Sequence, residues 1–163
     1  MRPWSTAFVS YGVNHIKWWS PQGDTWVASA GAFGAAGQFA VMSAVWLPSG
    51  KVLTGMPGGE IAVWSVGRKC VRVVRAHAAG PQVLRLDGPP THHGVRCLKL
   101  RGDLKSLLSA GADGHVIKWD VSSGDLKEGC VLGAVPVKSP YQGGAGGPNG
   151  PSAPVRRCRF TPD

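Results

Sequence analysis

The sequence lacks the long apolar runs and the close cysteine pairs that mark several classes of protein. No stretch approaches the roughly 18 uncharged apolar residues of a membrane-spanning helix, and residues 1–12 hold no apolar core of signal-peptide length. We therefore expect a soluble, intracellular protein without a membrane partner. The four cysteines form no C-x-x-C pair, which argues against a zinc knuckle or a redox motif. Buried free thiols are the simplest account of them.

Acidic residues are scarce. The chain has 9 of them against 18 Lys and Arg, which gives a formal net charge of +9. This excess suits an acidic partner such as a nucleic acid or an acidic protein surface, but basic residues scattered over a solvated surface explain it equally well. No block of five or more basic residues occurs, so the sequence does not favour a nucleic-acid-binding tail.

Glycine and proline are abundant among short apolar runs. The chain holds 24 Gly and 13 Pro, while hydrophobic residues make up 43% of it, enough for a packed core. Many turns between short apolar runs predict many short strands. The expected fold class is therefore all-β.

A repeat is visible when the chain is compared with itself. Each of three segments has two apolar residues before a Ser or Thr, then a short turn, then an aliphatic residue three positions before a Trp. The Trp residues are 45 and 55 residues apart, so the first interval fits one four-stranded unit and the second a unit about ten residues longer. The recurring residues are Ser10, Thr54 and Ser109, followed by Trp19, Trp64 and Trp119.

The turns and flanking runs predict how each unit folds. Residues 58–59 (Gly-Gly) and 113–114 (Asp-Gly) can adopt the positive φ angles of a tight primed hairpin turn. Each unit is then strand, tight turn, strand, with the Trp at the end of the second strand. We further predict innermost strands over residues 42–47, 95–100 and 155–160, and an outer strand over residues 70–75.

These units predict about three blades of a β-propeller, each an antiparallel four-stranded sheet. Closed propellers have about 4–8 blades, so we expect an incomplete ring and the remaining blades in a longer chain. The predicted division is a partial first blade at 1–34, a second at 35–76, a third at 77–138 with an insertion at 79–93, a low-complexity Gly/Pro loop at 139–154, and the first strand of a next blade at 155–163.

The third unit carries a family resemblance. Residues 110–120, Ala-Gly-Ala-Asp-Gly-His-Val-Ile-Lys-Trp-Asp, resemble a WD40 repeat. This resemblance implies a structural hydrogen-bond tetrad of His, Ser or Thr, Asp and Trp. In the third blade the set is His93 (or His77), Ser109, Asp113 and Trp119. The second blade has Gly58 where the Asp would lie, and the first also lacks the Asp.

A narrower resemblance covers the first unit. Residues 9–20 and 31–34, with residues 73–77, are similar to stretches of echinoderm microtubule-associated protein-like (EMAP-like) proteins. The resemblance implies microtubule binding in the cytoskeleton or a cilium, and tubulin's acidic surface would suit the positive net charge. Candidate contacts with an acidic partner are Arg68, Lys69, Arg72 and Arg75.

Catalytic and metal-binding interpretations are weaker. Adjacent His92 and His93 on one strand would point to opposite faces, and no acidic or thiol partner lies at ligand spacing. Ser109 and Asp113 with a His could imitate a catalytic triad, but a Ser on a middle strand is held for hydrogen bonding rather than exposed on a strained elbow. The glycine-rich runs lack Gly-Lys-Ser/Thr, so they are turns and not phosphate loops.

We therefore predict a non-catalytic WD-repeat scaffold of the cytoplasm and cytoskeleton that binds proteins and uses no cofactor or metal. The alternative is a basic WD-repeat adaptor in an RNA-processing or ribosome-assembly complex. Direct nucleic-acid binding by stacking is disfavoured, because the repeat leaves only Trp4, Trp18 and Trp26 for it.

Overall fold

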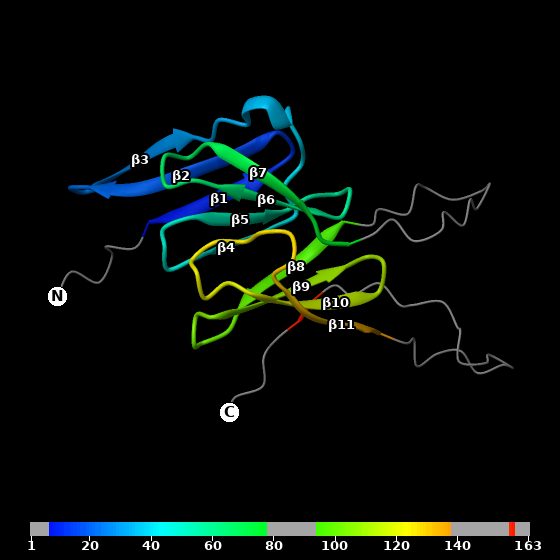
Figure 1. Cartoon of the computed structure of the whole chain (residues 1–163). Coiled ribbons are helices and arrows are strands. Elements are labelled where there is room, and N and C mark those ends of the chain that lie inside the picture. The colour runs from blue at the N-terminus through cyan, green and yellow to red at the C-terminus, as the bar shows by residue number, and fades with distance from the viewer. Residues whose placement is uncertain (1–6, 78–93, 138–156, 159–163) are drawn as a thin grey trace, which may run out of the picture.

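The computed structural model describes residues 7–77, 94–137 and 157–158. Over these ranges the chain forms antiparallel β-sheets and one short 3₁₀ turn, η1 (Gly34–Ala36) (Figure 1). The prediction of an all-β fold built from antiparallel sheets is confirmed. The first sheet has the order β1-β2-β3, formed by β1 (Phe8–Gly12), β2 (His15–Gln22) and β3 (Thr25–Ala30).

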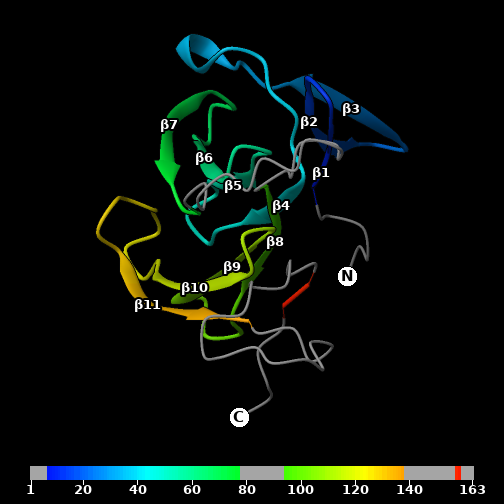
Figure 2. The same ribbon diagram turned by 90° about the vertical axis from the view of Figure 1, so that its right-hand side faces the viewer.

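The second and third sheets each contain four strands that follow one another in sequence. Their inner strands, β4 (Ser43–Trp46) and β8 (Val95–Leu100), lie against each other, so the two sheets radiate from this contact (Figure 2). The outer strand at residues 70–75 and the inner strand at residues 95–100 coincide with their predicted bounds. The strands are β4 (Ser43–Trp46), β5 (Val52–Gly55), β6 (Glu60–Trp64) and β7 (Cys70–Arg75), then β8 (Val95–Leu100), β9 (Ser106–Gly111), β10 (His115–Asp120) and β11 (Val131–Pro136).

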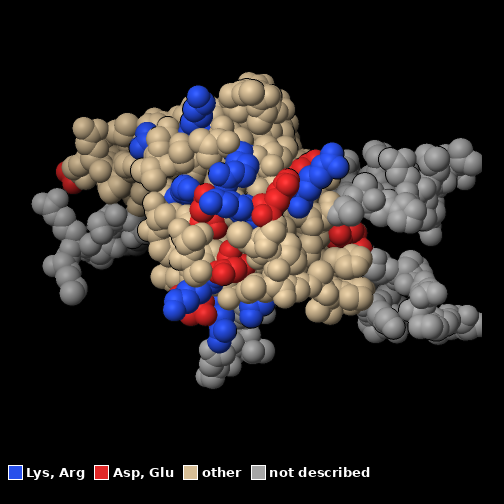
Figure 3. Space-filling view, in the orientation of Figure 1, with Lys and Arg blue, Asp and Glu red and all other residues tan. Residues whose placement is uncertain are grey.

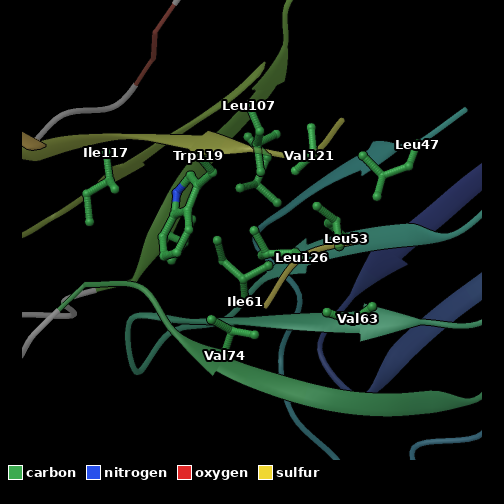
Figure 4. Packing of buried hydrophobic residues seen from close by; sticks show 12 residues of the cluster. Leu47, Leu53, Ile61, Val63, Val74, Leu107, Ile117, Trp119, Val121 and Leu126 are labelled. Carbon is green, nitrogen blue, oxygen red and sulfur yellow. The ribbon is translucent and has the colours of Figure 1, made fainter. Parts of the chain in front are cut away.

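Two apolar layers join the three sheets. Between the second and third sheets, the Trp119 ring packs with a set of aliphatic side chains that includes Ile61 and Leu107 (Figure 4). Between the first and second sheets, Ile16 packs with Trp64. Both Trp rings are fully buried. Each of these Trp residues therefore lies in the layer that joins its sheet to the preceding one.

The hairpin turns differ from the prediction. The loops β5–β6 and β9–β10 contain three residues, 57–59 and 112–114, and only the last residue of each has a positive φ: Gly59 at 97° and Gly114 at 78°. The prediction that both residues of each pair adopt the positive φ angles of a primed turn was wrong. A three-residue loop needs one left-handed residue, at its end. Asp113 therefore does not adopt a positive φ. Its carboxylate accepts a hydrogen bond from the His115 amide, 3.0 Å away.

The first sheet buries the neighbour of the predicted Trp. Trp18 is 5% exposed, and its ring lies edge-on to Trp64 with centroids 5.6 Å apart. Trp19 is only half-buried and stacks on Phe8 at 5.7 Å. Because successive side chains on a strand point to opposite faces, only one of the two adjacent rings can enter the layer. Trp18, which the repeat did not assign to the core, is that ring.

Residues 31–39, between β3 and β4, form a segment that joins the first two sheets. The rings of Phe33 and Phe39 pack on Trp64 with centroids 5.2 Å and 6.1 Å away. Ala32 pairs with the start of β7, because its amide donates to the Arg68 carbonyl and its carbonyl accepts from the Cys70 amide. The predicted boundary between residues 34 and 35 therefore falls inside a structural connection.

Some predictions fall outside the described residues. These are the insertion at 79–93, the loop at 139–154, and Trp4, His92 and His93. Of the strand predicted at 155–163, only Arg157 and Cys158 are described, and neither belongs to a strand. Within the described ranges no helix is long and apolar enough to cross a membrane, and no group of three or more His, Cys, Asp or Glu could hold a metal ion.

Candidate functional site

A buried chain of hydrogen bonds runs through the third sheet. The Trp119 indole N–H donates to the Ser109 hydroxyl over 2.8 Å. That hydroxyl lies 2.9 Å from Nε2 of His77, and Nδ1 of His77 lies 3.0 Å from the Asp113 carboxylate. The side chain of His77 is completely buried and that of Asp113 nearly so. The four residues come from β10, β9, the segment directly after β7, and the β9–β10 turn.

The partners determine the form of the His77 ring. A carboxylate can only accept, so Nδ1 carries the proton toward Asp113 and Nε2 accepts from the Ser109 hydroxyl. Burial lowers the pKa of His77, and this effect outweighs the nearby Asp113 charge, which acts to raise it. The ring is therefore neutral near pH 7, and each of its nitrogens has a hydrogen-bond partner.

Ser109, His77 and Asp113 follow the order of a catalytic triad, but their environment opposes nucleophilic catalysis. Ser109 has no exposed surface, and its oxygen already accepts a hydrogen bond from Trp119. A nucleophile must reach a substrate carbonyl, and no substrate can approach a buried oxygen. The arrangement stabilises the fold and joins the second blade's outer strand to the third sheet.

His77, rather than His93, occupies the histidine place in this network, while His93 lies outside the described residues. Both histidines precede β8 in the sequence, and His93 is the nearer. The position of His77 is set by its backbone, because its amide donates to the Gly59 carbonyl directly after β7. Gly111 leaves room for the ring: a Cβ there would lie 2.5 Å from both Nδ1 of His77 and the Asp113 carboxylate.

The other two sheets contain shorter versions of the network. In the second sheet Trp64 donates to the Thr54 hydroxyl over 2.9 Å, with Gly58 at the turn position of Asp113. In the first sheet Trp19 donates to Ser10 over 2.9 Å, and Nε2 of His15 lies 3.0 Å from the same hydroxyl. The Trp–hydroxyl bond is therefore common to all three sheets, whereas the further links differ.

The four candidate contacts for an acidic partner lie at and after the β6–β7 turn, in different environments. Lys69 and Arg75 are exposed, and Arg68 is half-buried in the turn with φ 65°. Arg72 has an intramolecular partner: its guanidinium donates to the Leu126 carbonyl over 2.8 Å and to the Asp125 carboxylate over 3.3 Å. The Arg72 side chain thus connects β7 of the second sheet to the segment between β10 and β11 of the third.

Asp125 is the centre of that contact. It also pairs with Lys51 on the second sheet, at 3.1 Å. Partial burial acts to raise the pKa of Asp125, but hydrogen bonds from Lys51 and Arg72 hold it below its usual range. Figure 3 shows acidic and basic side chains interleaved over this side of the molecule, not one continuous basic patch.

Comparison with known proteins agrees with this architecture. The family model for the WD domain, G-beta repeat, matches residues 68–120, from the β6–β7 turn to the end of β10. Cilia- and flagella-associated protein 44 of Trypanosoma brucei brucei is 30% identical to this chain in an alignment 149 residues long, which covers 83% of the chain. The chain spans only 8% of the length of that relative.

Solved structures share the fold at low sequence identity. The β-propeller domain of Cps50 (Swd1) from Myceliophteria thermophila superimposes with a TM-score of 0.55, at 15% identity over 74% of this chain and 38% of that one. A chain of the Mitotic Checkpoint Complex also gives 0.55, at 16% identity over 80% and 35%. Identities this low support the propeller fold alone. These similarities do not single out the EMAP-like family.

Proposed function

Because residues 68–120 carry a WD40 repeat and the described sheets are blades of a β-propeller, we propose that this chain belongs to a non-catalytic protein-interaction scaffold of the cilium or flagellum. The observation that carries the proposal is the 30% identity to cilia- and flagella-associated protein 44. Because the chain spans a small part of that relative, the proposal concerns the cellular location of these blades and not the activity of the whole relative.

A microtubule is the partner that we propose for the scaffold. The resemblance of residues 9–20 to EMAP-like proteins and the net charge of +9 support an acidic cytoskeletal partner. Arg68, Lys69 and Arg75 are the proposed contacts, because Arg72 is already paired with Asp125. Charges on an exposed rim act mainly on the rate of encounter and its salt dependence, so binding should weaken as ionic strength rises.

Co-sedimentation of the purified chain with microtubules tests this proposal. We expect the chain to pellet with intact microtubules and to pellet less after tubulin's acidic tails are removed. The variant Lys69→Glu/Arg75→Glu should bind at least several-fold more weakly. The control, Lys105→Glu/Lys127→Glu, changes the net charge equally at exposed sites outside the β6–β7 region, so it should keep most of the binding.

Two outcomes would overturn the microtubule proposal. One is equal loss of binding in both charge variants, which would indicate a nonspecific effect of net charge. The other is retention of RNA but not tubulin in a pull-down, which would favour the RNA-processing or ribosome-assembly adaptor. No feature of the described residues favours that adaptor at present.

A further inference from the structure

Two of the four cysteines lie in direct contact although they are far apart in sequence. Cys97 is on β8, the innermost strand of the third blade, and Cys158 is 61 residues later. Their sulfur atoms are 3.1 Å apart. The Cys158 backbone also lies against Cys97, because its amide donates to the Cys97 sulfur over 3.2 Å.

The remaining cysteines show that this contact is particular to one pair. Cys70 is buried on β7 and donates only to the Arg72 carbonyl, 3.8 Å away. Cys130 is half-buried against the apolar layer between the second and third blades. Among the residues that the structure describes, no third metal-ligating side chain joins Cys97 and Cys158, so the contact is one between two thiols.

The protonation of Cys158 is consistent with a hydrogen-bonded dithiol. Burial raises the pKa of Cys158 to about 12, and the hydrogen bond to Cys97 adds to the rise, while the positive charge of Lys99 opposes it. Near pH 7 the Cys158 thiol therefore keeps its proton and donates it toward the Cys97 sulfur. Both cysteines are only half-buried.

We propose that Cys97 and Cys158 form a redox-sensitive dithiol that closes to a reversible disulfide by exchange with a small disulfide such as oxidised glutathione. The Cys97 thiol loses its proton to solvent, and the thiolate attacks one sulfur of oxidised glutathione; a mixed disulfide forms, the glutathione S–S bond breaks, and the leaving glutathione thiolate takes up a proton from solvent. Cys158 then loses its proton to solvent, and its sulfur attacks Cys97 and expels the second glutathione. The protein dithiol is oxidised, and one glutathione disulfide is reduced to two glutathione molecules.

The consequence is a covalent link between the inner strand of the third blade and residue 158. The disulfide closes a loop of the chain that contains β9, β10 and β11, the other three strands of the third blade. A cross-link across a long loop restricts the unfolded chain more than the folded one. Oxidation should therefore raise the thermal midpoint of the chain, and reduction should reverse the change.

Thiol counting and intact mass after incubation with oxidised glutathione test the proposal in the 163-residue chain. The variant Cys70→Ala/Cys130→Ala keeps the pair, and we expect it to lose both thiols and the mass of two hydrogen atoms, with no bound glutathione. The matched control Cys97→Ala/Cys158→Ala should form no internal disulfide. A β-sheet circular dichroism spectrum checks that each variant is folded.

A third variant tests the order of the two steps. With Cys158→Ala added to Cys70→Ala/Cys130→Ala, only Cys97 remains, and we expect it to retain one glutathione because no second thiol can expel it. The proposal is overturned if the variant that keeps the pair stays reduced, retains glutathione or forms disulfide-linked dimers. It is also overturned if Cys97 alone does not react.

Discussion

The second and third blades are similar in strand order and differ in how each fixes its buried Trp. In the second blade the indole of Trp64 donates to Thr54 and the hydrogen-bond chain ends there. In the third blade the same bond, from Trp119 to Ser109, continues through His77 to Asp113. The second blade instead surrounds its Trp with aromatic rings, those of Trp18, Phe33 and Phe39.

The comparison separates what a blade requires from what it can add. In each described blade a Trp donates to a hydroxyl on the strand beside it. Among the described blades the His–Asp extension occurs only in the third, so the second blade holds its Trp without it. Apolar packing around Trp64 and polar links beyond Trp119 are alternative ways to hold one ring in place.

The largest effect is expected at the two Trp residues. Trp64→Ala and Trp119→Ala each remove a fully buried ring, and each should lower the free energy of unfolding by about 3–5 kcal/mol. Urea denaturation followed by β-sheet circular dichroism measures the loss. A clearly smaller loss for Trp119→Ala would mean that the polar network holds the third blade without its ring.

The next effect is specific to the third blade. Asp113→Ala leaves the buried Nδ1–H of His77 without its carboxylate, which should cost about 1–3 kcal/mol in unfolding free energy. The matched change in the second blade, Glu60→Ala, removes a half-buried carboxylate next to the corresponding turn and should stay within about 0.5 kcal/mol. Equal losses from the same urea titrations would show that the network adds nothing to the third blade.

A pH titration sharpens the comparison further. Burial lowers the pKa of His77 in the folded chain below its ordinary value of 6.5, so the unfolded chain takes up the proton first as the pH falls. Stability should therefore decrease as the pH falls through 6.5 and level off below the pKa of the folded state. His77→Gln should remove this part of the pH dependence in denaturation curves. An unchanged slope would contradict the assignment to His77.

The smallest effect is expected at the contact between these two blades. Asp125→Asn removes the charge that Lys51 and Arg72 share, and both basic side chains are partly exposed, at 29% and 40%. Solvent screening limits such pairs to about 1 kcal/mol or less, and salt should reduce the difference from the unmodified chain. A loss well above this, or one unaffected by salt, would indicate a stronger interblade link than the geometry suggests.

The local parts of this structure could be predicted from the sequence because they depend on neighbours along the chain. The bounds of β7 and β8 follow from short apolar runs between turn residues. The spacing of Thr54 and Trp64 places them on paired strands of one hairpin, where a side-chain bond can form. The turn type could not be predicted, because Asp-Gly and Gly-Gly are compatible with two kinds of turn. A primed turn needs a positive φ at both residues, whereas the three-residue loop found here needs it only at the last Gly.

The parts that could not be predicted depend on contacts between distant segments. Whether Trp18 or Trp19 enters the core is decided by the second blade, on which the strand packs. The sequence names both His93 and His77 for the histidine of the network, because both precede β8; the bonds that involve His77 reach residues 32 and 36 positions away. Arg72 was predicted to face a partner, but its carboxylate partner is 53 residues further along the chain.

Residues 31–39 have a consequence for how the molecule opens. Outer strands usually exchange their amide hydrogens quickly, since one side of each faces solvent. Here the Cys70 amide at the start of β7 is held by Ala32, and Gly31 crosses so closely that a Cβ would lie 2.6–2.9 Å from Ile16, Trp18 and Trp64. The end of β3 and the start of β7 should therefore lose protection together, as one cooperative unit that spans the first two blades.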